Sequence, residues 1–433
     1  MILQEILQRY VLGDAMREMK DSGIEWVGAI PAAWGVHRIA SHFQEIKEKN
    51  TANAYSNALQ FKMGKIIAKP QKWDEDETNE TYSAYTVVHP NTIMINGLNL
   101  EFDFVTQRVA RVECNGIITS AYIALSPRND INAEYICYLL KSYDACRAFH
   151  SMGRGLRKIL SYSELKNKPI VVPPLAKQEH IAAFLDAECA EIDAVLEKTR
   201  ASIEEYKKLK QAIITQAVTK GIRGDRPMKD SGIEWIGDIP AEWDVIRVKQ
   251  LLKERNERSK EGKEEPLSMS QKVGLVPTKF LESIPNMASS FVGAKLAYVD
   301  DLVFNKLKAH LGVFSVSRYD GLVSPDYAVY CSTGKSNLKY LEYIFKTPQC
   351  IGEFRKKSTG IAAGLMRLYT EGLFSIYLPY PALSEQEEIA EYLNEKCAGI
   401  DALIAKKQQY LTEIENYKKS LIYEYVTGKK EVV

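Results

Sequence analysis

The sequence is poor in the features that would assign a protein to a location outside the cytoplasm. Its seven cysteines are odd in number and form no C-x-x-C pair, which favours reduced thiols over a disulfide framework or a zinc site. No stretch approaches the ~18 consecutive apolar residues that a membrane span needs. The opening residues alternate apolar and polar side chains and lack the apolar core of a signal peptide. We therefore expect a cytoplasmic protein that does not enter a membrane.

Motifs for bond chemistry are missing as well. No H-E-x-x-H or G-x-S-x-G occurs, and the six histidines show no spacing typical of metal ligands. The TGKS segment at 333–336 looks like the end of a phosphate-binding loop, but Val329 stands where that motif requires a glycine. The Pro-Pro pair at 173–174 leads into a predicted helix and lacks the flanking residues of an adenine methyltransferase signature. We expect a non-catalytic chain with no metal site and no cofactor of its own.

An excess of charge of either sign is also absent. The 433 residues carry a net charge of +1, with 45% hydrophobic and 26% charged residues, which is ordinary for a soluble globular protein. No global basic field indicates nucleic acid, although acidic residues elsewhere can balance a local basic face. The length predicts about three domains, and two or four are equally admissible.

The sequence does contain an internal repeat. MKDSGIEWVGAIPAAW at 19–34 and MKDSGIEWIGDIPAEW at 228–243 share thirteen of sixteen residues at a displacement of 209. A second pair, PPLAKQEHIA from position 173 and PALSEQEEIA from position 381, is displaced by 208. Near-equal displacements indicate that one unit was duplicated. The residues between the repeated segments mostly differ, so we predict two copies of one fold with divergent middles.

Each copy is predicted to begin with an opening segment, followed by short strands and then a helix. Two tryptophans are the apolar anchors of each opening segment: Trp26 and Trp34 in the first copy, and Trp235 and Trp243 in the second. Residues 1–18 are either a short helix or an extension at the start of the chain. The predicted strands are 85–88, 92–95 and 116–119 in the first copy and 296–304, 312–316 and 323–331 in the second. The predicted helices are 133–149 and 338–354.

A long helix is predicted after each divergent middle, over 177–219 and 385–427, with Gly221 and Gly428 as helix-ending glycines. Ser384 and Glu387 form a predicted capping box in the second copy, where the first has Ala176. Heptad spacing predicts a seam typical of a coiled coil. Its residues are Leu185, Ile192, Thr199, Tyr206 and Ile213 in the first helix and Leu393, Ile400, Lys407, Ile414 and Leu421 in the second. The second apolar position of the heptad, called the alternate position, is assigned to Val195 and Leu209 in the first helix. In the second helix it is assigned to Leu403, Tyr410 and Tyr417.

Connectivity predicts that the two helices run antiparallel, because the first ends where the second copy begins and the second begins where that copy ends. Each would be about 65 Å long, with one globular part at each end. The expected fold class is α+β: two α/β domains joined by two long antiparallel coiled-coil helices, with a pseudo-two-fold internal repeat. The predicted boundaries are 1–174 and 227–382 for the domains and 175–226 and 383–433 for the helices. Thr199 and Lys407, near the helix midpoints, either meet as a polar pair or are tolerated at an exposed edge.

Two globular parts related by a two-fold axis would match the local symmetry of duplex DNA, and unlike middles would recognise unlike half-sites. Each middle ends in a basic cluster beside glycine, a combination suited to phosphate and guanine. The candidate DNA-binding residues are Lys62, Lys65, Arg154, Arg157 and Lys158 in the first copy and Lys306, Lys308, His310, Arg355, Lys356, Lys357 and Arg367 in the second. Any one of these cations alone is more often a solvated surface charge.

The layout resembles that of the specificity subunits of type I restriction-modification systems. SGIEWxGxIPxxW before each middle, PPLAKQEHIA and its twin before each long helix, and QAVTKG at 216–221 with YVTG at 425–428 carry the resemblance. It implies a subunit that binds a bipartite, asymmetric double-stranded DNA site and two modification subunits, with restriction subunits joining for cleavage. It further implies adenine methylation, with S-adenosylmethionine, ATP and Mg belonging to those partners. The departures are residues 1–18 and Ala176.

Two other readings stay open on the sequence. A non-enzymatic coiled-coil scaffold with protein-binding ends would show the same helices, and exchange of one middle would then leave DNA affinity unchanged. A nuclease with an unrecognised acidic site would cleave DNA by itself in the presence of a metal ion.

The basic clusters generate a first prediction. Arg157→Ala and Arg367→Ala should each weaken DNA binding by the assembled complex, because each removes a guanidinium that can contact DNA. The affinity of each variant for duplex DNA is measured over a range of salt concentrations. Full affinity with an unchanged salt slope in both variants would show that these clusters are not the contact sites.

Overall fold

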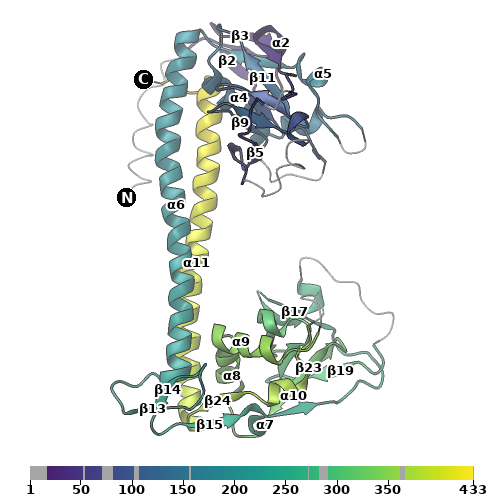
Figure 1. Ribbon diagram of the computed structural model, residues 1–433, viewed down its shortest axis with the longest axis vertical. Coiled ribbons are helices and arrows are strands. Elements are labelled where there is room, and N and C mark those ends of the chain that lie inside the picture. Colours follow the sequence, from purple (N-terminus) through teal and green to yellow (C-terminus); the bar gives the residue numbers. More distant parts are fainter. Residues whose placement is uncertain are drawn as a thin grey trace. The chain divides into compact units, whose positions relative to one another are not determined.

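The computed structural model groups the chain into two compact units. Unit 1 comprises residues 1–200 and 409–433, and unit 2 comprises residues 201–408. The structure describes residues 17–51, 54–70, 81–101, 107–155, 158–271, 273–281, 291–360 and 366–432. Each unit therefore holds a globular part together with a portion of each long helix (Figure 1).

The globular part of unit 1 is built on a four-stranded antiparallel sheet. Its strand order is β4 (Phe43–Glu45), β11 (Ile123–Pro127), β8 (Ile93–Ile95) and β9 (Val109–Arg111). The two-stranded pairs are β1 (Met19–Asp21) with β2 (Ala29–Pro31), β3 (Gly35–Arg38) with β12 (Pro169–Val172), β5 (Leu59–Lys62) with β6 (Lys65–Ala68), and β7 (Thr86–Val88) with β10 (Gly116–Ile118). The short helices are α2 (Ile39–His42), α4 (Ala133–Ala145), η1 (Ala148–Ser151) and α5 (Tyr162–Leu165).

Unit 2 repeats this strand order. Its four-stranded sheet runs β16 (Leu252–Arg255), β23 (Tyr327–Ser332), β20 (Leu302–Asn305) and β21 (Phe314–Val316). The pairs are β13 (Met228–Asp230) with β14 (Asp238–Pro240), β15 (Asp244–Arg247) with β24 (Tyr377–Tyr380), β17 (Leu267–Ser270) with β18 (Gly274–Pro277), and β19 (Lys295–Ala297) with β22 (Gly321–Val323). The short helices are α7 (Val248–Leu251), η2 (Thr278–Phe280), η3 (Ala309–Leu311), α8 (Leu338–Phe345), α9 (Pro348–Lys357) and α10 (Thr370–Phe374).

Several predicted elements are shorter in the structure than in the sequence pattern. The single strands predicted over 296–304 and 323–331 are each two strands, β19 with β20 and β22 with β23. The predicted helix 338–354 is broken into α8 and α9, because Thr347 caps a new helix whose first residue is Pro348. The predicted helix 133–149 ends at Ala145 and is followed by η1.

A cluster of aromatic side chains lies in the core of unit 2. In unit 2, Phe304 stacks on Phe314 at 4.5 Å between ring centroids, and Phe345 and Phe354 meet Phe304 edge to face. Of the repeated tryptophans, Trp34 and Trp243 are buried in their cores, whereas Trp26 and Trp235 are half-buried.

The two long helices are α6 (Leu175–Lys220) and α11 (Leu383–Val426), close to the predicted spans. Ion pairs cross from the α6 segment to the α11 segment and its carboxyl-terminal extension in unit 1: Lys177–Glu431, Asp193–Lys418 and Arg200–Glu415. In unit 2, Lys210 of α6 pairs with Asp401, and Arg223, just beyond the end of α6, pairs with Glu388. Within each unit the partner numbers fall as the α6 numbers rise, so the segments run antiparallel (Figure 1). Because α11 begins at Leu383, Ser384 lies inside its first turn, and the predicted capping box is wrong.

The predicted seam is only partly the packed one. Leu185, Ile192, Thr199, Leu393, Ile400, Ile414 and Leu421 are buried, and Tyr206, Ile213 and Lys407 are half-buried. The alternate positions were assigned wrongly at Leu209 and Leu403, whose side chains are 49% and 46% exposed. The structure instead buries a different set of residues, each four positions after a residue of the main seam: Cys189, Leu196, Ile203 and Ala217.

Thr199 and Lys407 each have another partner. The Thr199 hydroxyl donates to the carbonyl of Val195 on its own helix at 2.8 Å. The Lys407 ammonium lies 5.7 Å from the centre of the Tyr206 ring.

A joint of buried polar side chains connects each globular part to the long helices. In unit 1, the Gln178 Oε1 atom accepts from the backbone N–H of Asn132 at 2.9 Å, and its Nε2 atom donates to the carbonyl of Pro173. The Asn132 side chain caps α4 by accepting from the N–H of Tyr135. The Tyr135 hydroxyl lies 2.9 Å from the carbonyl of Val426, to which it donates.

Unit 2 repeats the joint with Gln386, Asn337, Tyr340 and the carbonyl of Val218. Burial raises the pKa of both tyrosine hydroxyls well above the usual value, so both remain protonated donors at neutral pH. Each globular part is thus bonded to the beginning of one long helix and to the end of the other.

Two glycines of the carboxyl-terminal segment generate a second prediction, because Gly428 follows α11 and Gly399 lies inside it. Gly428 has a φ of +69°, and a Cβ there would meet the ring of Pro31 and lie 2.9 Å from Trp34, so Gly428→Ala should cost about 1–3 kcal/mol. Gly399, inside α11, faces open space, so Gly399→Ala should stabilise by about 0.5–1 kcal/mol. Denaturant unfolding of the chain measures both. Equal effects of the two substitutions would contradict the structure at Gly428.

Candidate nucleic-acid interface

The two predicted basic clusters occupy the same place in the two units. In unit 1, Arg154 and Ile159 exchange backbone hydrogen bonds of 3.1 and 3.0 Å, and the Leu160 N–H donates to Gly97 beyond β8. In unit 2, Thr359 and Arg367 exchange bonds of 3.0 and 2.8 Å, and the Leu368 N–H donates to Lys306 beyond β20. The segments 153–160 and 358–368 are here called the basic loops. Their described residues, 153–155 with 158–160 and 358–360 with 366–368, are held at the end of the equivalent strand in each unit.

The strand ends under these loops are built alike. The Asn96 side chain accepts from the N–H of Leu98, and the Asn305 side chain accepts from the N–H of Leu307. A Cβ at Gly97 would meet the carbonyl of Leu160, so the unit 1 loop lies directly on the backbone. Unit 2 has Lys306 at the equivalent position. The same site can therefore present different chemistry in the two units.

The described cations of the basic loop in unit 1 are exposed to solvent. The Arg154 side chain is 82% exposed and is 3.9 Å from Glu164, too long for a firm ion pair. Lys158 is exposed at a φ of +40°, and Gly155 turns the chain at +79°. Arg157 lies outside the described residues. Arg154 and Lys158 are thus available to a phosphate.

Unit 2 brings Arg367 and Lys306 together around Asp326. The Arg367 guanidinium is 3.5 Å from the Asp326 carboxylate, and the Lys306 ammonium donates to the carbonyl of Pro325 at 3.2 Å. Burial lowers the pKa of Lys306 from its usual value, and the positive charge of Lys295 adds to this effect. Both cations can exchange these partners for a phosphate.

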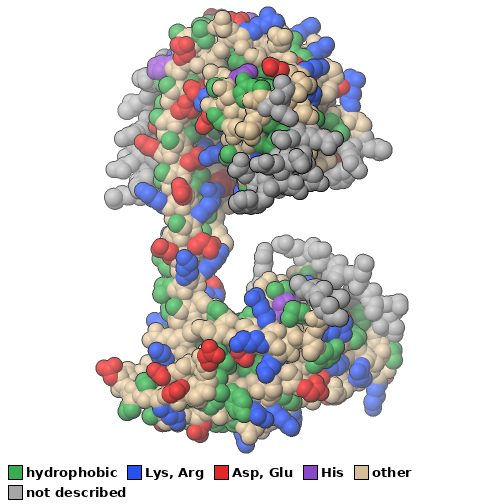
Figure 2. Space-filling view, in the orientation of Figure 1, with side chains coloured by type: hydrophobic (Ala, Val, Ile, Leu, Met, Phe, Trp, Pro, Cys, Tyr) green, Lys and Arg blue, Asp and Glu red, His purple; other side chains and the backbone are tan. Residues whose placement is uncertain are grey.

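Arg355, Lys356 and Lys357 are exposed on the last turn of α9, where the helix dipole favours positive charge. Lys356 is paired with Glu353 at 2.7 Å. Blue side chains gather over this part of unit 2 in Figure 2. This turn leads directly into the basic loop, so the two form one basic surface.

Lys308 is exposed at the start of η3, which packs against α9. His310, on the same short helix, was an incorrect candidate. Its side chain is buried, and its Nδ1 atom has no hydrogen-bond partner among the described residues. The sequence pattern could not separate these two neighbours, because η3 has no periodicity to assign a face.

Lys62 and Lys65 lie opposite each other at the tip of the β5–β6 hairpin and are exposed. The sequence analysis missed Met63 between them, which is 59% exposed, and Val273 on the equivalent β17–β18 hairpin of unit 2, which is 62% exposed. The alternating strands on either side of Met63-Gly64 are the signal that could have located the first tip.

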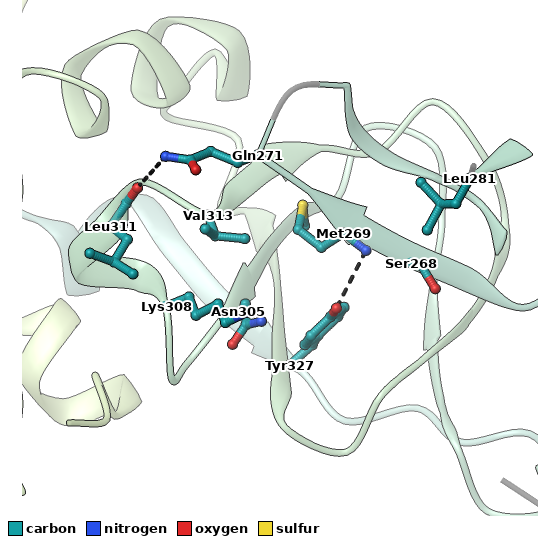
Figure 3. Close-up of a pocket in the computed structure, with 9 residues that line it drawn as sticks. All are labelled: Ser268, Met269, Gln271, Leu281, Asn305, Lys308, Leu311, Val313 and Tyr327. Carbon is teal, nitrogen blue, oxygen red and sulfur yellow. Dashed lines mark hydrogen bonds between the residues drawn. The ribbon is translucent and has the colours of Figure 1, made fainter. Parts of the chain in front are cut away.

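A cavity of about 440 Å³ lies beneath the β17–β18 hairpin (Figure 3). It is lined by Ser268, Met269, Gln271, Leu281, Asn305, Lys308, Leu311, Val313 and Tyr327. The Tyr327 hydroxyl accepts from the N–H of Met269 at 3.3 Å, and the Gln271 amide donates to the carbonyl of Leu311 at 3.1 Å. These bonds connect the hairpin to the sheet and to the loop that carries Lys308.

Within the described residues, no cluster of three or more His, Cys, Asp or Glu side chains is arranged to hold a metal ion. No helix in this part of the chain has the length and apolarity to cross a membrane.

The chain is similar to known proteins. Residues 114–205 match the model of the type I restriction modification DNA specificity domain. The chain is 23% identical over 428 residues to the type I restriction enzyme MjaVIII specificity subunit of Methanocaldococcus jannaschii, covering 93% of this chain and 94% of that protein.

One solved structure shares the fold of this chain. A structure from a study of complex assembly and conformational transition of the type I R-M system has a TM-score of 0.68 at 12% identity, over 93% of this chain and 99% of that one. The HsdS subunit of Thermoanaerobacter tengcongensis has a TM-score of 0.48 at 14% identity, over 93% and 98%. With its duplicated sheets and paired long helices, the chain is similar to type I restriction-modification specificity subunits, and residues 114–205 match the DNA specificity domain of that family.

Proposed function

We propose that each globular part is a target-recognition domain that binds one half of a bipartite, asymmetric DNA site. The observation that carries the proposal is the equivalence of the two basic loops, which lie at the same strand end in both units but differ in length and sequence. A shared scaffold presents the loop to DNA in the same way, and unlike side chains on it discriminate unlike half-sites. Such a site is asymmetric although the scaffold is repeated.

The long helices carry the second half of the proposal. We infer that α6 and α11 form an antiparallel coiled coil with a pseudo-two-fold repeat, which sets the spacer between the half-sites and docks two modification subunits. The exposed Leu209 and Leu403 support a protein-binding role for the helices, because apolar side chains at such positions are stabilised when a partner covers them. The predicted seam residues then pack the two long helices against each other.

In this proposal the chain itself is a non-catalytic, cytoplasmic DNA-recognition subunit. Methyl transfer from S-adenosylmethionine to adenine belongs to the modification subunits, and ATP- and Mg-dependent cleavage belongs to the restriction subunits. The alternative, a coiled-coil scaffold with protein-binding ends, uses the same exposed leucines. Replacing residues 38–173 by the middle of a relative separates the two, since only a recognition domain would change the DNA half-site.

The proposal generates a third prediction, tested on the genome of the source cells. Deleting the gene should abolish N6-methyladenine at one bipartite motif with a fixed gap, because the modification subunits would lose their means of finding it. Single-molecule sequencing of deleted and complemented cells measures this. In cells where the intact gene supports a methylated motif, persistence of that motif after deletion would contradict the proposed function.

A fourth prediction concerns the basic surface of unit 2. The double substitution Arg355→Ala with Lys357→Ala should weaken binding of the assembled complex to all duplexes alike. The salt slope of the affinity should fall in magnitude by up to about 1.8, because each lost phosphate contact removes about 0.9. Titration of specific and random duplexes at several salt concentrations measures both quantities.

The matched control is Lys229→Ala. Lys229 is exposed on β13, which lies away from α9 in Figure 1, so its loss should leave the slope unchanged. An unchanged slope in the double variant, or a loss confined to one sequence, would exclude phosphate contacts at the end of α9.

A further inference from the structure

The β5–β6 hairpin of unit 1 ends in a tight tip, Lys62-Met63-Gly64-Lys65. Lys62 and Lys65 pair across it, and Met63 and Gly64 have φ angles of +48° and +69°. Two central residues with positive φ are typical of the turn that best fits the twist of a two-residue hairpin. Glycine suits this position, because it adopts a positive φ without strain, and a Cβ there would lie 2.5 Å from Oε1 of Gln107 and displace that side chain. The tip is therefore a defined structure.

Met63 is held in this tip with most of its side chain in solvent. A positive φ is uncommon for a residue other than glycine, asparagine or aspartate. The equivalent hairpin of unit 2 also exposes an apolar residue, Val273, beside Gly274 at a φ of +76°. Two equivalent tips that both expose an apolar side chain indicate a contact surface.

The hairpin is seated on the central sheet. Phe61 packs edge to face on Tyr122, with ring centroids 5.7 Å apart, immediately before β11. In unit 2, Tyr327 at the start of β23 takes the same position under its hairpin and accepts a hydrogen bond from Met269 (Figure 3). The tip is thus carried by packed elements, as precise recognition requires.

The shape and chemistry of the tip match the major groove of DNA. A two-stranded β-ribbon fits this groove, and apolar side chains contact the C5 methyl group of thymine there. Lys62 and Lys65 flank Met63 and are exposed, so they can engage the phosphates on either side. A protein partner would need an acidic surface around an apolar pocket to match the same tip.

We propose that the β5–β6 tip is a base-reading element of unit 1, in which Met63 contacts a thymine methyl group in the first half-site. The basic loop with Arg154 and Lys158 then supplies phosphate contacts beside the tip. This inference rests on the proposed function and assigns the specificity-determining side chain within it.

The experiment uses the assembled methyltransferase complex and duplexes that carry its bipartite motif. Each thymine of the first half-site is replaced in turn by deoxyuridine, which removes only the methyl group. One such replacement should lower wild-type affinity about fourfold, the value for burial of one methyl group. Met63→Ala should lower affinity for the thymine duplex to a similar extent. On the deoxyuridine duplex the variant should show no further loss.

Two controls accompany the measurement. Val273→Ala, the matched substitution in unit 2, should leave the deoxyuridine effect in the first half-site unchanged. Met63→Gln keeps the length of the side chain and removes its apolar end, so it should behave as Met63→Ala does. Because Met63 is largely exposed, thermal unfolding of both Met63 variants should match the wild type.

The outcomes separate the two levels of the argument. If the wild-type complex shows no bipartite preference, the proposed function itself fails. If it shows the preference but the losses from Met63→Ala and from every deoxyuridine replacement add independently, only the assignment of the tip is overturned. A first half-site without any A·T pair, or a uniform loss of affinity with a changed salt slope, would overturn it as well.

Discussion

The buried joint of glutamine, asparagine and tyrosine is the interaction on which the structure of each unit depends. Gln178 and Gln386 are almost fully buried, so each of their amide groups must be satisfied by the globular part it touches. Tyr135 and Tyr340 then bond the carbonyl ends of the opposite helices. Loss of one partner would leave a buried polar group unsatisfied. The joint therefore fixes each globular part, and the basic loop it carries, to both long helices.

This rigid joint lets the rest of the globular part vary. At the end of β8, Gly97 allows the loop to lie on the backbone, whereas the equivalent Lys306 adds a charge to the surface. The hairpin tip has two residues between paired strand ends in unit 1 and three in unit 2. Such differences change the groups presented to a ligand without changing the strand order. A repeated scaffold can thus carry two unlike recognition surfaces.

Long-range periodicity and repetition made much of this architecture predictable. The long helices, their direction within each unit and the repeated segments followed from heptads and displacements, because these signals extend over dozens of residues. The errors were local. Pro348 broke a helix that its apolar spacing continued, and His310 proved buried beside exposed Lys308. Leu209 and Leu403 proved exposed, because either of two neighbouring positions can complete a heptad and only the partner helix selects one.

The sequence by itself determined that the chain is a duplicated α+β protein with two long helices and a basic cluster in each copy. It also contained Gln178 and Gln386 at matching positions, yet their role was invisible without their partners. Only the tertiary structure decided that the basic loops are equivalent, that Arg367 and Lys306 share Asp326, and that Met63 stands exposed between lysines. The physical reason is that hydrogen bonds and burial at these positions depend on residues far apart in the chain, whereas helix formation depends on neighbours.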